Sequence, residues 1–352
     1  MNLEKATILK VLQKITDPIS KKNIVENDMV KEIHIKDKNV QVVIEISPNT
    51  PADKRKAIES SAQSLISEIE QVKNVFIVIT AEKTNLVKGV KQVKHIIAVA
   101  SGKGGVGKST TTTNLAIAMQ KLGLKVGIMD ADVFGPSQPR MLGIKGKPDA
   151  SNKQALPPME GYGLKAMSIG FLVAEDKPIV WRGPMVMSAV KQMLNDVMWG
   201  ELDVLMVDMP PGTGDAQLTL AQSVPLSGAV IVSTPQDIAL IDARKGIAMF
   251  QKVNVPILGI IENMSMFICP NCNHESHIFA NGGAKSEAKK LGVNFLGEIP
   301  IDIDIRKTSD TGLPIVATKP DNPQSKIYME MAKQINHSLN NQKNKKPTIQ
   351  FS

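Results

Sequence analysis

The sequence predicts an α/β protein with a doubly wound, mostly parallel sheet, preceded by a small α/β domain. From Ile96 onward, short unbroken apolar runs alternate with helical stretches, a pattern typical of parallel strands buried on both faces. The first run leads into a glycine-rich loop and then a helix. Residues 1–80 have amphipathic elements of their own, and a lysine-rich stretch, 81–95, separates the two regions. We therefore expect a small domain at 1–80, a linker at 81–95 and a larger domain at 96–340.

The small domain is predicted to have the element order α-β-β-α-β. Two helical stripes and three short strands follow from its apolar periodicity, and a turn at 36–39 joins the first two strands. The stretch contains no cysteine and a single histidine, His34. The apolar residues that define its elements are Ile8, Val11, Leu12 and Ile15; Ile33 and Ile35; Val40, Val42, Ile44 and Ile46; Ile58, Ala62, Leu65 and Ile69; and Val75, Ile77 and Ile79.

The larger domain is predicted from buried strands separated by helices. Right-handed βαβ crossovers between such strands give a doubly wound sheet. The Asn/Gln/Lys-rich residues 341–352 are predicted to form a disordered tail. The expected strands lie at 96–100, 126–129, 204–207, 229–232 and 257–261.

Composition excludes several classes of protein. Of the 352 residues, 42% are hydrophobic, which is too many for a wholly disordered chain. No apolar run reaches the roughly 18 residues that a membrane span needs, and residues 1–10 lack a signal-peptide core. Two cysteines are too few for a disulfide scaffold. We therefore expect a cytoplasmic protein that does not bind membranes.

The net charge of +8 does not indicate nucleic-acid binding. Residues 96–332 are electrically balanced; residues 81–95 and 333–352 carry eight lysines and one glutamate, and runs of this kind are typical of solvated segments. We expect no nucleic-acid partner. These lysines are Lys83, Lys88, Lys91 and Lys94 before the central domain, and Lys333, Lys343, Lys345 and Lys346 near the C-terminus.

The glycine-rich loop fits the phosphate-binding pattern G-x-x-x-x-G-K-[ST] over 102–109, between a predicted strand and a predicted helix. Its glycines let backbone N–H groups converge on phosphate oxygens, and the helix N-terminus adds positive potential. Lys108 is expected to contact the β- and γ-phosphates, and the Ser109 hydroxyl to bind Mg²⁺. The predicted ATP-binding residues in this loop are Gly102, Lys103, Gly104, Gly105, Val106, Gly107, Lys108, Ser109 and Thr110.

Two aspartates follow other predicted strands. Asp208 ends the strand at 204–207 and occupies the position that supports Mg²⁺ in P-loop proteins. Asp132 follows the strand at 126–129 and could orient the attacking water; the alternative is a loop carboxylate that caps a turn. The Pro-Pro-Gly-Thr-Gly stretch after Asp208 could move when the γ-phosphate leaves.

With Lys103, the loop GKGGVGKST resembles the deviant Walker A motif of the family containing MinD, ParA and the nitrogenase iron protein. Within that family the chain most resembles the Mrp/ApbC iron–sulfur cluster carriers, over about residues 90–335. Residues 1–80 resemble the small iron–sulfur assembly domain fused to some bacterial members. Some of those domains carry a cysteine, and this one does not, so we assign it no cluster-binding role. The shared motifs are DADVFGPS, WRGPM at 181–185, VDMPPGTGD, STPQ at 233–236, and ENMS followed by CPNC.

The resemblance implies a P-loop NTPase fold and further residue roles. Lys103 would contact phosphates bound in the opposite subunit of a dimer, and Asn263 would lie near the adenine. Lys103, Lys108, Asp132 and Asp208 would then be the catalytic residues of a slow ATPase. The ordinary alternatives are a loop lysine and a turn asparagine.

Cys269 and Cys272 form a C-x-x-C pair that directs two thiols at one centre. Iron–sulfur clusters and structural zinc commonly take four ligands, so a Cys₄ site requires two chains and predicts a homodimer. An intrachain zinc site with His274 and His277 has too short a spacer, although zinc across the dimer and a redox pair remain alternatives. Four methionines near the two tryptophans indicate ordinary packing rather than a metal site: Met185, Met187, Met193 and Met198.

These observations predict an ATP-dependent carrier that binds a [4Fe–4S] cluster between two subunits. Its expected partners are apo iron–sulfur proteins and cluster scaffold proteins. One alternative is a MinD/ParA-like positioning ATPase. The tail argues against it, because it lacks the amphipathic membrane helix of MinD-like members. Another is a zinc-stabilised binding module.

Overall fold

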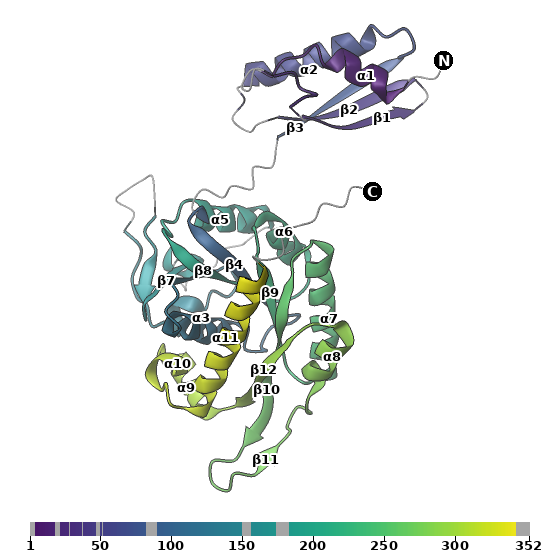
Figure 1. Ribbon diagram of the computed structural model, residues 1–352. Coiled ribbons are helices and arrows are strands. Elements are labelled where there is room, and N and C mark those ends of the chain that lie inside the picture. Colours follow the sequence, from purple (N-terminus) through teal and green to yellow (C-terminus); the bar gives the residue numbers. More distant parts are fainter. Residues whose placement is uncertain are drawn as a thin grey trace. The chain divides into compact units, whose positions relative to one another are not determined.

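The computed structural model describes residues 4–17, 22–27, 29–36, 38–46, 50, 52–81, 90–149, 156–173 and 183–342. The chain divides into two compact units, Met1–Asn85 and Leu86–Ser352, drawn in Figure 1. Each unit has a hydrophobic core of its own. The predicted fold class is confirmed, since the larger unit is a mostly parallel α/β sheet and the smaller one has the order α-β-β-α-β.

The first unit packs two helices against a three-stranded sheet of order β1-β2-β3. The first two strands are antiparallel, and β2 and β3 are parallel. Ile15 is buried but lies beyond the end of the first helix, so the predicted stripe was longer than the helix. The elements are α1 (Lys5–Leu12), β1 (Val30–Lys36), β2 (Asn39–Ile46), α2 (Ala52–Ser67) and β3 (Asn74–Ala81).

The second unit is built on a sheet of order β11-β10-β9-β4-β8-β5-β7-β6, with β12 paired to β10. Antiparallel pairing joins β6 to β7 and β11 to β10; the other strand pairs are parallel. The strands are β4 (Val93–Ala100), β5 (Val126–Asp130), β6 (Met159–Gly161), β7 (Leu164–Ser168), β8 (Leu202–Asp208), β9 (Gly228–Ser233), β10 (Ile257–Ile268), β11 (Glu275–Ser276) and β12 (Phe295–Ile301).

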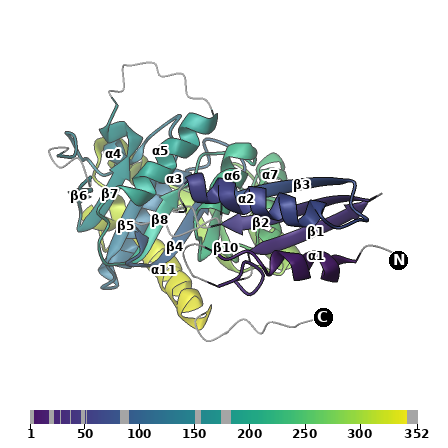
Figure 2. The same ribbon diagram turned by 90° about the horizontal axis from the view of Figure 1, so that it is seen from above.

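Helices cover both faces of this sheet. Figure 2 shows α5, α6 and α7 on one side of β4 and β8, and α11 on the other. Helix α11 packs along α3 and α10, while α7 contacts both α6 and α8. The helices are α3 (Lys108–Lys121), α4 (Gln138–Met141), α5 (Gly183–Asn195), α6 (Asp215–Ser223), α7 (Asp237–Lys252), α8 (Gly283–Leu291), α9 (Ile303–Thr311), α10 (Ile315–Thr318) and α11 (Pro323–Gln342), with a 3₁₀ turn at Ile169–Phe171.

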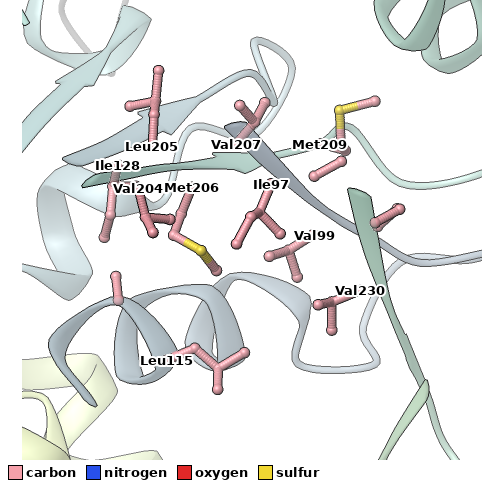
Figure 3. Packing of buried hydrophobic residues seen from close by; sticks show 14 of the residues in the cluster. Ile97, Val99, Leu115, Ile128, Val204, Leu205, Met206, Val207, Met209 and Val230 are labelled. Atoms are coloured by element: carbon pink, nitrogen blue, oxygen red, sulfur yellow. The ribbon is translucent and has the colours of Figure 1, made fainter. Parts of the chain in front are cut away.

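The core explains why the central strands read as continuous apolar runs. In Figure 3, Leu115 of α3 faces the side chains of Val99 and Met206, whereas Leu205 and Val207 point to the opposite face of the sheet. All five residues are essentially inaccessible to solvent. A strand between two helical layers must be apolar at every position, which removes the period-two alternation.

Strand β10 is the main departure from the predicted elements. The expected strand ended at Ile261, but β10 continues through Glu262 to Ile268. The buried Glu262 carboxylate accepts hydrogen bonds from the N–H groups of Gly282 (3.2 Å) and Ala284 (2.6 Å) at the start of α8. The sequence indicated a break where the apolar run stopped. The strand continues by pairing with β9 and β12, and distant backbone donors allow the Glu262 carboxylate to be buried within it.

Several predictions concern segments that the structure describes only in part. Lys83, Lys88, Trp181, Arg182 and residues 343–352 lie outside the described residues. Strand β4 begins at Val93, and Lys94 within it pairs with Asp203 at 2.6 Å. In the described ranges, no helix is both long enough and apolar enough to span a bilayer.

Candidate nucleotide-binding and thiol sites

The glycine loop connects the carboxyl end of β4 to the first residue of α3. Gly105 and Gly107 have positive φ angles of 79° and 81°, which glycine adopts without strain. A Cβ at Gly107 would lie 2.1 Å from Asn263 Nδ2, and one at Gly102 would lie 2.4 Å from the Asp242 carbonyl carbon. Both glycines therefore also permit close packing. Since β4 lies between β8 and β9, the loop opens at the centre of the sheet's carboxyl edge, where α/β proteins bind ligands.

Lys108 lies at the centre of a buried charge cluster. Its Nζ atom is 2.6 Å from Asp208 Oδ1, 3.8 Å from Asp132 Oδ2 and 3.3 Å from Ser109 Oγ. Only 6% of Lys108 is exposed, and Asp208 is fully buried. The structure thus brings the loop residues Lys108 and Ser109 together with the two aspartates that the sequence singled out after other strands. Removing one partner of such a buried ion pair strongly destabilises the folded protein, because the other charge is left buried without compensation.

The Asp208 carboxylate is held through both oxygens. Oδ1 also accepts a hydrogen bond from Thr112 Oγ1 at 3.2 Å, and Oδ2 accepts one from Gln138 Nε2 at 2.9 Å. Asp130 lies alongside it, at the end of β5, and is also fully buried. Burial, reinforced by the neighbouring charge of Asp208, raises the pKa of Asp130 to about 7.

Asp132 has a related environment. Burial raises the pKa of Asp132, although the Lys108 ammonium opposes the shift. The oxygens of Ser109, Asp132 and Asp208 gather around one lysine, and hydroxyl and carboxylate oxygens are ligands that suit Mg²⁺. Ser109 and Asp208, the two residues predicted for magnesium, therefore have oxygens suited to that ion.

A cavity of about 560 Å³ opens next to the glycine loop. Asn263 contributes to its wall and donates from Nδ2 to the Val106 carbonyl oxygen at 2.8 Å. Asn263 lies within strand β10 and not in a turn. The cavity has the size of a small-molecule site. Other residues that line the cavity include Gly107, Thr110, Arg140, Phe279 and Ile305.

Lys103 projects from the loop toward the start of α7. Its Nζ donates to Gln236 Oε1 at 3.1 Å, so its partner in the single chain is the residue that precedes α7. The neighbouring Gly102 packs against Asp242 of the same helix. Helix α7 also exposes two apolar side chains, those of Ile238 and Ile241.

The two cysteines lie at the tip of a hairpin formed by β10 and β11, which extends beyond the rest of the sheet in Figure 1. The Cys269 N–H donates to the His274 carbonyl at 3.0 Å, and the Asn273 N–H donates to the Cys269 carbonyl at 2.8 Å. Cys269 is half-buried and Cys272 is exposed. Backbone N–H groups of Asn271 and then Cys272 donate to the Cys269 sulfur and lower the pKa of its thiol. The turn therefore favours the thiolate, the form that binds metals.

The nearby histidines have other contacts. His277 Nε2 lies 3.3 Å from Glu275 Oε1 and 3.1 Å from Asn281 Nδ2. In the parts of the chain that the structure describes, no three side chains of His, Cys, Asp or Glu are grouped as metal ligands. The intrachain zinc alternative therefore has no preassembled site there.

Sequence reasoning missed residues whose role depends on distant contacts. Gln138 and Thr112 contact Asp208, and nothing in their local sequence marks them. Gln236, which contacts Lys103, ends the STPQ motif, but no role was predicted for it. The methionines are divided: Met193 is buried and Met187 packs against the core, whereas Met185 and Met198 are about half exposed. The first two have the core packing that was predicted.

The sheet order, the glycine loop and the lysine–aspartate cluster define a nucleotide-binding P-loop NTPase. Residues 92–336 match the family model described as NUBPL iron-transfer P-loop NTPase, and residues 5–77 match the iron–sulfur cluster assembly protein family. The chain belongs to the NUBPL iron-transfer P-loop NTPase family, which confirms the resemblance drawn from its motifs.

Known relatives extend over most of the chain. The iron-sulfur cluster carrier protein of Haemophilus influenzae is 43% identical over 337 residues, covering 94% of this chain and 91% of that protein. The iron-sulfur cluster transfer protein NUBPL of Dictyostelium discoideum is 54% identical over 268 residues, or 74% of this chain and 83% of that protein.

Solved structures agree with the fold. A nucleotide-binding protein of Archaeoglobus fulgidus, in complex with ADP, is 41% identical with a TM-score of 0.60, covering 69% of this chain and 96% of its own. The cell division ATPase MinD of Pyrococcus furiosus has a TM-score of 0.53 at 23% identity, and covers 70% of this chain and 99% of its own. The second likeness concerns the fold alone.

Proposed function

We propose that this protein is an ATP-dependent iron–sulfur cluster carrier of the cytoplasm. A homodimer holds a [4Fe–4S] cluster between two Cys269–Cys272 turns and delivers it to apo-proteins. One observation carries the proposal: strand β10 contributes Asn263 to the nucleotide pocket and ends next to Cys269. At about 3.3 Å per residue of extended strand, these two positions are at most roughly 20 Å apart.

The cluster is the cargo, and its ligand count requires a second chain. Each chain supplies two thiols, whereas a [4Fe–4S] cluster on cysteines takes four. The exposed hairpin tip leaves both thiols accessible to a partner copy and to a recipient protein. Cluster scaffold proteins are the corresponding donors. The relatives named as iron-sulfur cluster transfer and carrier proteins support the assignment of a cluster as the cargo.

ATP binding and slow hydrolysis regulate the geometry of the dimer. Lys108 exchanges its contact with Asp208 for the β- and γ-phosphate oxygens. Ser109 and Asp208 would hold Mg²⁺, which would neutralise phosphate charge. Asp132, no longer paired, orients the attacking water. Lys103 leaves Gln236 and reaches phosphates in the opposite subunit, while Asn263 lies near the adenine.

The two alternatives account for less of the molecule. A positioning ATPase needs the P-loop but gives no role to the cysteine hairpin. A zinc-stabilised module uses the hairpin but gives no role to the cluster of Lys108, Asp132 and Asp208. Neither relates the two sites that β10 connects.

Anaerobic reconstitution followed by transfer tests the proposal. We expect about four irons and four sulfides per dimer, from the ligand count of a bridging [4Fe–4S] cluster. Transfer to an apo-enzyme should depend on ATP. A monomer that holds a full cluster would contradict the bridging model, and a dimer that takes one zinc and refuses iron would favour the structural alternative.

A further inference from the structure

Gln138 is a buried amide at the start of α4, outside the motifs that define P-loop proteins. It is fully inaccessible to solvent. It follows the segment that runs from Asp130 through Asp132 to Ser137, and its backbone N–H donates to Asp130 Oδ2 at 3.1 Å. Gln138 is therefore fixed to the end of β5 through its main chain, and its side chain extends toward β8 and α3.

The amide group has complementary partners on both ends. Nε2 donates to Asp208 Oδ2 at 2.9 Å and lies 3.3 Å from the Ser109 carbonyl oxygen, while Oε1 accepts from Thr113 Oγ1 at 2.8 Å. The chemistry determines the orientation of the amide, because a rotated group would direct Oε1 at two acceptors. A glutamate at this position would likewise direct a carboxylate oxygen at the same two acceptors. The site therefore requires a neutral donor of this length.

The two oxygens of Asp208 have different neighbours. Oδ1 contacts the Lys108 ammonium and the Thr112 hydroxyl, whereas Gln138 is the hydrogen-bond donor to Oδ2. When Lys108 turns to the phosphates, Asp208 gives up the Lys108 ammonium and must be oriented for Mg²⁺, while it still faces Asp130, a second carboxylate at the same edge of the sheet. Gln138 is neutral, so the phosphates do not attract it as they attract Lys108, and its contacts with Thr113 and Asp130 hold it in place. It can keep the carboxylate in place during that exchange.

We propose that Gln138 is a positioning residue for ATP hydrolysis: it fixes the rotation of Asp208 so that Oδ1 remains directed toward the Lys108–Ser109 side, and it ties the Asp132-containing segment to that carboxylate. The inference rests on the proposed ATPase activity. It adds a residue that acts through Asp208 and does not itself contact the nucleotide. It predicts that loss of the amide impairs the Mg²⁺-dependent step more than nucleotide binding.

The test compares Gln138→Met with the wild type as full-length protein. Methionine has a similar length but cannot donate, so Asp208 Oδ2 loses its partner. We expect kcat to fall by about 10- to 100-fold, the range for misplaced catalytic groups, with KM for ATP within about 2-fold. The Mg²⁺ concentration for half-maximal activity should rise by about 10-fold.

Two controls separate positioning from packing. Gln120→Met makes the same exchange near the far end of α3, beside Gly163, and should leave kcat and the Mg²⁺ dependence unchanged. Thr113→Val retains Gln138 but removes the donor to Oε1, and should lower kcat in the same direction by a smaller factor. Thermal unfolding of each variant establishes that the fold is retained; if Gln138→Met unfolds, Thr113→Val supplies the test.

A readout independent of turnover distinguishes this inference from the proposed function. ADP affinity is measured with and without Mg²⁺, and Gln138→Met should lose most of the enhancement by Mg²⁺ while retaining metal-free affinity. If the wild type shows this enhancement but no hydrolysis, the ATPase proposal fails and the positioning of Asp208 still stands. If Gln138→Met lowers metal-free affinity and kcat equally, or leaves the Mg²⁺ dependence unchanged, Gln138 has only a packing role.

Discussion

Lys108 serves both the charge balance of the buried cluster and the predicted chemistry. Without a nucleotide it neutralises Asp208 and approaches Asp132. With a nucleotide, the same ammonium is the positive charge available near the β- and γ-phosphates. The lysine can be buried before its ligand arrives because Asp208, at the end of β8, neutralises its charge and accepts its hydrogen bond.

Lys108→Ala should lower ATPase activity by at least about 100-fold, because charge stabilisation at the transferring phosphate is lost. It should also lower the free energy of unfolding by about 3–5 kcal/mol, since Asp208 is left buried without its ion partner. Steady-state hydrolysis and urea unfolding measure the two effects. Cluster binding should persist, because the thiols lie elsewhere.

Lys125→Ala is a matched control for this lysine. Lys125 forms an exposed pair with Glu201 at 3.1 Å, and such pairs contribute roughly 0–1 kcal/mol. Activity and stability should therefore stay close to wild type. Full ATPase activity in Lys108→Ala would refute the assignment of the phosphate site.

At the scale of elements, the glycine loop and β10 depend on each other. Asn263 of β10 donates to the loop carbonyl of Val106, and Gly107 leaves the room that this contact requires. The strand continues from Asn263 through Met264, which has a positive φ of 58°, to Ile268 and the cysteine turn. One strand thus supports both the nucleotide pocket and the thiols.

Gly107→Ala should destabilise the nucleotide-free protein more than Gly123→Ala. Both glycines have positive φ, at 81° and 89°, which costs an L-residue about 1–2 kcal/mol. A Cβ at Gly107 also meets Asn263 Nδ2, whereas one at Gly123 has nothing within 4 Å. Urea unfolding compares the two variants, and ADP binding should weaken only in Gly107→Ala. Equal losses would show that the contact with Asn263 does not constrain the loop.

Cys269→Ala and Cys272→Ala should each abolish the visible absorbance of the reconstituted cluster. Either change leaves two thiols per dimer, too few for a Cys₄ site. Basal ATPase activity should remain measurable because Lys108 and its loop are untouched. Absorbance spectra and iron analysis after anaerobic reconstitution provide the measurement.

His274→Ala and His277→Ala are the internal control for the hairpin. The bridging model needs neither histidine, whereas an intrachain zinc site needs both. Retained cluster in these two variants, together with its loss in the cysteine variants, is the expected pattern. Loss of metal in all four would point to the zinc site instead.

At the scale of the whole molecule, the proposal requires two copies of the chain. The thiol count calls for a second chain at the cluster, and the deviant lysine Lys103 is expected to act across the same dimer. In one chain Lys103 contacts Gln236, an uncharged partner that a phosphate can replace. Ile238, on α7 two residues after Gln236, is more than half exposed.

Lys103→Ala should reduce hydrolysis by about 10-fold or more while changing ATP affinity little, because its charge acts on phosphates held by the other subunit. Mixing Lys103→Ala with Lys108→Ala subunits should give hybrid dimers with at most one complete site, and hydrolysis should respond to the mixing ratio. Equal losses in rate and affinity, with no response to mixing, would indicate an ordinary loop lysine.

The sequence by itself determined the fold class, the phosphate loop and the thiol pair. Each is encoded locally: unbroken apolar runs mark strands covered on both faces, the glycine–lysine spacing shapes a phosphate cradle, and C-x-x-C brings two sulfurs together. Asp132 and Asp208 could be named in advance because the ends of parallel strands meet at one edge of a sheet.

Only the tertiary structure decided how these parts combine. It extended β10 past Ile261, where Glu262 can be buried because its carboxylate accepts hydrogen bonds from the start of α8, 20 and 22 residues away in the chain. It placed Gln138 on Asp208 and Lys103 on Gln236. Such contacts join residues far apart in the sequence, and a hydrogen bond depends on where the fold brings two groups, which no local pattern of residues records.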